Sequence, residues 1–157
     1  MNSLIVKIIE KLKRDNKSIS FAESCTGGRI AVEFTAVSGA STVLNGSCVT
    51  YSNEIKHEWL KVKKDTLDKF GAVSKECVSE MVEGIKKMSK SDYAIAVSGI
   101  AGPTGGSALK PVGTVYIALL TPTSKEVFHC LFEGDREQIQ VSATQFSIEK
   151  LVNYLEI

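Results

Sequence analysis

The order of helical and extended segments is the feature of this 157-residue sequence that most constrains its fold. Near the amino terminus, Ile5, Ile8, Ile9 and Leu12 have the spacing of an amphipathic helix, and a short β-prone run over residues 18–22 follows. We expect further helices over residues 29–37, 54–60, 65–70 and 75–88 and a last one capped by Asp135, with strands over 46–51, 93–97, 114–120 and 125–132. Helices and strands alternate in the first part of the chain, and one antiparallel hairpin comes late. This order predicts an α/β fold, a three-layer α/β/α sandwich with a mixed sheet.

The composition is that of one ordinary globular domain over residues 1–157. Lys and Arg (19) nearly cancel Asp and Glu (18), so charge favours neither nucleic acid nor an anionic membrane as a partner. No apolar run approaches the roughly 20 residues that span a bilayer, and no secretory signal pattern is present. We therefore expect a cytoplasmic protein that binds neither nucleic acid nor a membrane. We also expect a small-molecule substrate and a homo-oligomer.

The cysteines and histidines do not form a metal-binding pattern. Cys25, Cys48, Cys77 and Cys130 include no CxxC pair, and His57 and His129 are the only histidines. We expect reduced thiols, with the last three cysteines buried as small apolar side chains, and neither a metal nor another cofactor.

The segment AESCTGG, residues 22–28, places two reactive side chains between a predicted strand and a predicted helix. Ser24 is the preferred candidate nucleophile, and Cys25 is the alternative, since a helix amino terminus stabilises a thiolate. Thr26 shares the turn, and Gly27 and Gly28 would leave backbone N–H groups open to an anion or a developing oxyanion. The alternative is a tight turn with a capping side chain.

A serine nucleophile needs a base, and we expect neither histidine to serve. Lys56 is the better candidate, because the first turn of a helix and partial burial both lower the pKa of an amine. Tyr51, at the preceding strand end, is expected to relay or orient the proton. A surface lysine is the alternative interpretation.

Ligands of α/β sheets bind beyond the carboxyl ends of parallel strands. Residues 23–28, 51–56 and 98–106 each follow a predicted strand there. The last of these lies in a glycine-rich loop over residues 98–113, which lacks the GxxxxGK[ST] phosphate-loop pattern but could hold a phosphate or a carbonyl. Arg136 could clamp a substrate phosphate, or it could form a surface ion pair.

These segments together resemble the C-terminal domain family of the competence/damage-inducible protein CinA. The matching motifs lie in the family's order over nearly the whole chain: AESCTGG (22–28), VTYSNEIK (49–56), GAVS (71–74), SGIAGPTGG (98–106), KPVGTVYIAL (110–119) and GDR (134–136). The resemblance implies a three-layer α/β/α fold whose mixed, mostly parallel sheet carries one antiparallel strand. It also implies a metal-independent nicotinamide-nucleotide amidase, which hydrolyses nicotinamide mononucleotide to nicotinate mononucleotide and ammonia.

The family's functional residues fall on matching positions. The resemblance implies that Ser24 is the nucleophile, Lys56 the general base and Tyr51 the assisting tyrosine. The resemblance places the family's loop contact at Ser98 and its substrate-anchoring arginine at Arg136. We also expect substrate binding by the turn after the first strand and by the glycine-rich loop, at Cys25, Thr26, Gly27, Gly28, Gly99 and Gly102.

Two departures from the family pattern affect this interpretation. Family members often carry a basic residue four positions after the arginine of GDR, where this chain has Gln140, so phosphate binding is expected to be weaker or to use another side chain. Longer members also have an N-terminal molybdopterin-binding-like domain, which we expect this chain to lack. A non-catalytic nucleotide-binding module and an amidase for another pyridine carboxamide remain alternative functions.

Overall fold

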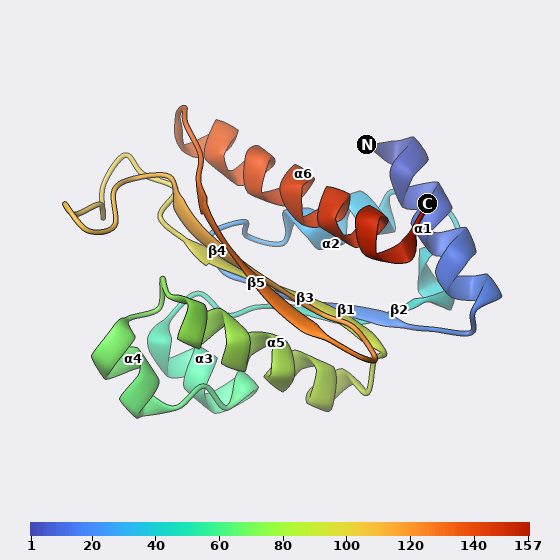
Figure 1. Ribbon diagram of the computed structural model, residues 1–157, viewed down its shortest axis with the longest axis horizontal. Helices are drawn as coiled ribbons and strands as arrows, with labels where there is room; N and C mark the ends of the chain where they lie inside the picture. Colours follow the sequence, from blue (N-terminus) through green and yellow to red (C-terminus); the bar gives the residue numbers. More distant parts are fainter.

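A five-stranded mixed sheet forms the middle layer of the molecule, with strand order β2-β1-β3-β4-β5 (Figure 1). The computed structural model describes residues 1–157. The strands are β1 (Ile19–Glu23), β2 (Leu44–Val49), β3 (Tyr93–Gly99), β4 (Thr114–Leu120) and β5 (Lys125–Leu131). β1 pairs in parallel with β2 and β3, whereas β4 is antiparallel to both β3 and β5. One strand therefore opposes the other four, as the resemblance implied.

Helices cover both faces of the sheet and complete the three predicted layers (Figure 1). One face is covered by α1 (Asn2–Arg14), α2 (Arg29–Thr35) and α6 (Arg136–Leu155), and the other by α3 (Asn53–Leu60), α4 (Lys64–Phe70) and α5 (Lys75–Ser89). A short 3₁₀ helix, Ala40–Thr42, precedes β2 and was not predicted. The α/β/α fold class is confirmed.

The central strands are buried on both sides, which explains their continuous apolar composition. All five residues of β1 are buried, and so are the five middle residues of β3. The predicted stripe of α1 lies in the larger of two apolar cores, between the sheet and α1, α2 and α6. The central strands are thus held firmly from both faces, and the site lies where two of them end.

Side-chain caps fix where three of the helices begin. Ser52 accepts a hydrogen bond from the backbone N–H of Ile55, and Ser74 caps α5 in the same way. Asp135 and Gln138 form a reciprocal capping box at the start of α6. These caps place Lys56 in the first turn of α3 and Arg136 at the first position of α6.

Several predicted boundaries were wrong for reasons of strand pairing. β2 spans Leu44–Val49 instead of 46–51, because its pairing with β1 begins at Leu44. β3 continues through Ser98 and Gly99, predicted as loop, because they pair with Tyr116 and Val115 of β4. Cys77 is buried as expected, but Cys48 and Cys130 are only half-buried, since they lie on the two edge strands.

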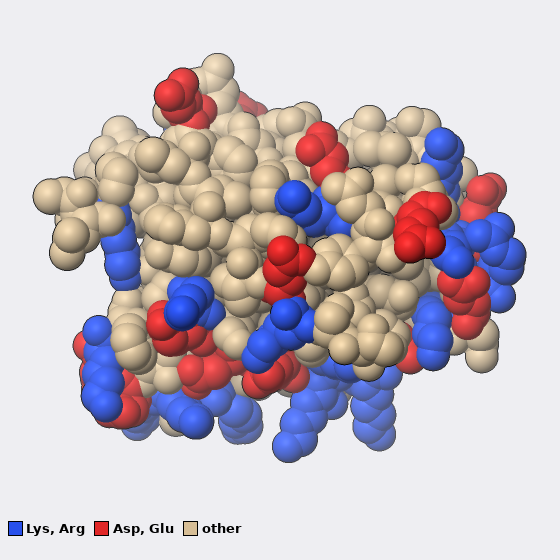
Figure 2. All heavy atoms as spheres, viewed as in Figure 1, with Lys and Arg blue, Asp and Glu red and all other residues tan.

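Positive and negative side chains are interspersed over the face of the molecule that Figure 2 shows, so this face does not carry charge of a single sign. Figure 2 shows many of them along the layer formed by α3, α4 and α5, while the area over α6 and β5 is largely uncharged. None of the helices combines the length and the apolar character that a membrane crossing would require.

Candidate active site

A cleft of about 240 Å³ lies at the carboxyl ends of β1 and β3. It is lined by residues from all three segments at the strand ends and from α6. Among the predicted site residues, the lining includes Ser24, Cys25, Tyr51, Lys56, Ser98, Gly99, Gly102 and Arg136. The fold thus brings together positions that are up to 112 residues apart in the sequence, from Ser24 to Arg136.

Ser24 and Lys56 are in direct contact within this cleft. The Lys56 Nζ lies 3.0 Å from the Ser24 Oγ, and both side chains are buried. The same Nζ donates to the backbone carbonyl oxygens of Thr50 at 2.7 Å and Tyr51 at 3.2 Å. A neutral amine has two hydrogens and one lone pair, so when the carbonyls take the hydrogens, the lone pair faces the Ser24 hydroxyl. This arrangement suits a lysine that accepts the serine proton.

The environment of Lys56 favours the neutral amine that this role requires. The side chain is 1% exposed, and no carboxylate forms a salt bridge with it. Burial lowers the pKa of Lys56 from its ordinary value of 10.5, because a charged amine loses its hydration. The positive end of α3 also disfavours a cation in the first helical turn.

Cys25 lines the cleft but does not have the properties of a reactive thiolate. It is buried, and burial raises the pKa of its thiol to about 12. The thiol therefore remains protonated at neutral pH, which contradicts the alternative that this turn stabilises a thiolate. Ser24, with the Lys56 amine in contact, remains the preferred candidate nucleophile.

The sequence interpretation missed the role of Glu23, which organises the turn after β1. Its buried carboxylate accepts hydrogen bonds from the backbone N–H groups of Ile30 and Ala31, at 3.1 Å each, and from the Thr26 hydroxyl at 2.6 Å. The first turn of α2 is therefore occupied by a carboxylate of the chain itself. A buried acid just before a helix was the signal that could have revealed this contact.

We expect Glu23→Gln to destabilise the fold by about 1–3 kcal/mol, because the new amide group would face backbone N–H donors without accepting from all of them. Urea unfolding of the wild type and the variant measures this difference. Glu10→Gln, at an exposed position without a hydrogen bond, is the matched control. Equal midpoints for the two variants would contradict the assigned role of Glu23.

The turn after Ser24 has backbone N–H groups without a partner in the chain, and of the residues that carry them only Cys25 lines the cleft. Gly27 N–H is taken by the Ser24 carbonyl oxygen at 3.0 Å, whereas the N–H groups of Cys25, Thr26 and Gly28 have no acceptor in the chain. Gly27 and Gly28 have φ angles of 62° and 99°, so these glycines shape the turn. Neither they nor Thr26, whose hydroxyl binds Glu23, line the cleft.

Arg136 lines the cleft from the start of α6 and forms no salt bridge, so the alternative of a surface ion pair is wrong. Its guanidinium donates to the Gly102 carbonyl oxygen at 2.7 Å and to the Tyr51 hydroxyl at 3.0 Å. A guanidinium has further N–H donors, which leaves capacity for an anion.

Tyr51 does not hold the position expected of a proton relay. Its hydroxyl is bonded to Arg136, it makes no hydrogen bond to Ser24 or Lys56, and the residue is 62% exposed. It is the backbone carbonyl of Tyr51 that contacts the Lys56 amine. In this geometry, the tyrosine orients the arginine and the lysine.

The end of β3 supplies the remaining wall. Ser98 is buried at the cleft, and its hydroxyl makes no hydrogen bond within the chain. Gly99 allows close strand contact, because a Cβ there would lie 2.8 Å from the Thr114 carbonyl oxygen. The Ser98 hydroxyl is therefore a free polar group beside Ser24 and Lys56.

The two histidines lie outside the cleft, in structural positions. His57 Nδ1 is 2.7 Å from the Val62 carbonyl oxygen, and the His129 ring stacks on Tyr116 with centroids 4.5 Å apart. No group of three or more His, Cys, Asp or Glu side chains is gathered in a way that could hold a metal ion. The polar side chains that do line the cleft include those of Ser24, Lys56, Ser98 and Arg136.

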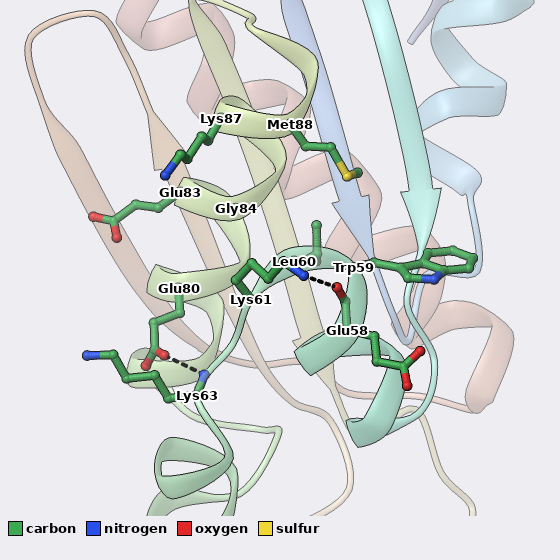
Figure 3. Close-up of a pocket in the computed structure, with 10 residues that line it drawn as sticks. All are labelled: Glu58, Trp59, Leu60, Lys61, Lys63, Glu80, Glu83, Gly84, Lys87 and Met88. Carbon is green, nitrogen blue, oxygen red and sulfur yellow. Dashed lines mark hydrogen bonds between the residues drawn. The ribbon is translucent and has the colours of Figure 1, made fainter.

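A larger groove, of about 880 Å³, lies between the end of α3 and α5 (Figure 3), and Ser24 is not among its lining residues. Exposed Trp59 and Met88 line it together with glutamates and lysines, and no serine, threonine, cysteine or histidine is among its lining residues. At its floor, Gly84 lets α5 approach α3 closely, since a Cβ would collide with the Leu60 carbonyl. Size alone therefore does not identify the reactive site. The contact between the Ser24 hydroxyl and the Lys56 amine makes the smaller cleft the candidate active site.

The fold and the cleft define a three-layer α/β/α domain with a buried serine–lysine pair at the carboxyl edge of its sheet. A family model described as "CinA C-terminal domain" matches residues 1–155. The chain belongs to the CinA C-terminal domain family.

Relatives and solved structures agree with this membership. The chain is 49% identical over 144 residues to a "CinA-like protein" of Fervidobacterium nodosum, which covers 92% of the chain and 35% of the relative. It is 46% identical over 149 residues to a "CinA-like protein" of Thermotoga neapolitana, covering 95% of the chain and 36% of the relative. The chain thus spans about a third of the length of these curated relatives.

The chain matches solved structures over nearly the full length of both proteins. A competence/damage inducible protein from Agrobacterium tumefaciens aligns with a TM-score of 0.95 and 36% identity, covering 99% of this chain and 95% of that chain. A CinA superfamily protein from Klebsiella pneumoniae aligns with a TM-score of 0.94 and 35% identity, covering 99% of this chain and 97% of that chain.

Proposed function

We propose that the chain is a nicotinamide-nucleotide amidase, which hydrolyses nicotinamide mononucleotide to nicotinate mononucleotide and ammonia. The observation that carries the proposal is the 3.0 Å contact between the buried Lys56 amine and the Ser24 hydroxyl. A lysine with a lowered pKa in contact with a serine supports nucleophilic catalysis without histidine. The CinA resemblance supports the choice of substrate.

In the proposed reaction, the Ser24 Oγ attacks the carboxamide carbon while its proton passes to neutral Lys56. The negative charge that develops on the carboxamide oxygen is met by unpartnered N–H groups of the turn, of which Cys25 N–H directly follows the nucleophile. Each such donor is worth about 3 kcal/mol in transition-state stabilisation. Lys56 then protonates the departing ammonia, and it activates a water molecule that hydrolyses the acyl-enzyme.

The other half of the cleft suits the phosphoribosyl group. Arg136 carries a positive charge without a salt-bridge partner, and the free Ser98 hydroxyl and residues of the glycine-rich loop line the same cleft. Binding energy from the phosphate can then orient the carboxamide against Ser24.

The proposal is tested by ammonia release from nicotinamide mononucleotide, nicotinamide riboside and nicotinamide. We expect turnover of the mononucleotide and much slower turnover of the two compounds that lack phosphate. Binding of the mononucleotide in calorimetry with no ammonia release would favour the non-catalytic module instead. Faster turnover of nicotinamide would favour an amidase for another pyridine carboxamide.

We expect Arg136→Met to raise the KM for nicotinamide mononucleotide by about 10- to 100-fold, because a hydrogen-bonded charge pair contributes about 1.5–3 kcal/mol. The KM for the riboside should change little, since it has no phosphate to lose. Initial-rate kinetics on both substrates checks this, with exposed Arg14→Met as the control for the lost charge. An equal rise in KM for both substrates would contradict the assignment of Arg136 as the phosphate anchor.

A further inference from the structure

Helix α6 contacts the nucleophile turn through the side chain of Gln140, which is half-buried. The Gln140 Nε2 donates to the Cys25 carbonyl oxygen at 2.9 Å, and the Gln140 Oε1 accepts from Arg29 Nη2 at 3.4 Å. A carbonyl requires the NH₂ end of the amide and a guanidinium requires the oxygen, so the two contacts specify the same orientation. Gln140 thus connects two elements that flank the turn after Ser24.

This contact fixes a peptide plane next to the nucleophile. In a trans peptide, the C=O and the N–H point in opposite directions, so holding one also directs the other. The Ser24–Cys25 peptide is held at its carbonyl by Gly27 N–H, and the Cys25–Thr26 peptide is held at its carbonyl by Gln140. At the other end of each plane is an N–H group without an acceptor, that of Cys25 and that of Thr26.

We propose that Gln140 is a positioning residue for catalysis: by binding the Cys25 carbonyl it holds the nucleophile turn, and with it the unpartnered Cys25 N–H at the cleft, in place for the developing oxyanion. This inference rests on the proposed amidase function. Gln140 does not line the cleft with Ser24 and Arg136, so it acts through the turn and not through contact with substrate. At the position where family members often carry a basic residue, the Gln140 amide thus contacts the backbone beside the nucleophile.

The test compares three substitutions of Gln140 that differ in their donor. Gln140→Met keeps the length of the side chain but cannot donate, Gln140→Glu places an acceptor opposite the Cys25 carbonyl, and Gln140→Lys keeps a donor. Gln145→Glu, at an exposed position of the same helix, is the control for the charge change. Each variant is measured by ammonia release from nicotinamide mononucleotide, by thermal denaturation, and by the ¹H–¹⁵N signals of the Cys25 and Thr26 amides.

We expect Gln140→Met and Gln140→Glu to lower kcat by about 10- to 100-fold with little change in KM, because small displacements of catalytic groups have effects of that size. The two amide signals should shift in both variants, while Gln140→Lys and Gln145→Glu retain most of the wild-type kcat. Wild-type kcat in Gln140→Met, or unchanged amide signals, would overturn the inference. A wild type that releases no ammonia, with amide signals that still shift, would reject the amidase function and leave the positioning of the turn supported.

Discussion

Ser24→Ala is expected to lower kcat for ammonia release from nicotinamide mononucleotide by about 10⁴- to 10⁶-fold, the loss typical of a removed serine nucleophile. The Ser24 hydroxyl has a single hydrogen-bond partner, the Lys56 amine, which retains the Thr50 and Tyr51 carbonyls after the substitution. The variant should therefore fold normally and still bind the nucleotide through Arg136. Steady-state kinetics, calorimetric binding and thermal denaturation together measure these three properties.

Cys25→Ala is the matched control, since it removes the neighbouring cleft side chain that competes for the nucleophile role. The thiol is buried and stays protonated, so this variant should keep kcat within about tenfold of the wild type. Full activity of Ser24→Ala would contradict the serine mechanism. Loss of activity in Cys25→Ala alone would assign the attack to the thiol.

The layered fold could be predicted from the sequence because its signals are local. The apolar stripe of α1, the capping residues Ser52, Ser74 and Asp135, and the β-prone runs all depend on short-range spacing. These local signals could not predict which strands pair or in which register they pair. The extension of β3 through Gly99 and the start of β2 at Leu44 depend on partner strands that are distant in sequence.

The candidate site likewise has residues that the sequence could predict and contacts that it could not. Ser24 and Lys56 could be selected because a turn after a strand and a first helical turn are both recognisable in sequence. The contacts of Glu23 with α2, of Gln140 with the Cys25 carbonyl and of Tyr51 with Arg136 could not be predicted. They depend on how loops and helices pack beside the sheet, which no residue spacing records. Sequence therefore indicated the reactive groups better than the groups that hold them.

In the proposed mechanism, Lys56 links the rate to pH, and its burial sets the direction of the effect. Its pKa is lowered by burial, so the neutral amine that accepts the Ser24 proton forms as pH rises through that lowered pKa. The rate of ammonia release should rise with pH over this range and then level off. Between the lowered pKa of the folded state and the ordinary value of 10.5, the unfolded chain binds one more proton at this position, so the free energy of unfolding should also increase with pH.

Other buried groups affect stability in the opposite direction at alkaline pH. Burial raises the pKa of Cys77 from 9.0 to about 11 and that of Cys25 to about 12, so above pH 9 the unfolded chain loses these protons first and stability falls. The contribution of Lys56 is therefore obtained from the difference between the wild type and a variant without the amine, measured at each pH.

Lys56→Met is expected to lower kcat by about 10²- to 10⁴-fold, the contribution typical of a positioned general base, and to abolish the rise of rate with pH that Lys56 causes. The difference in unfolding free energy between the wild type and this variant should change with pH only between the lowered and the ordinary lysine pKa. Urea unfolding and initial rates over a pH series measure both effects, with exposed Lys64→Met as the control for loss of an amine. If Lys56→Met kept more than about a tenth of the wild-type kcat, or if its pH–rate profile matched that of the wild type, Lys56 would not be the base and another group would have to take the serine proton.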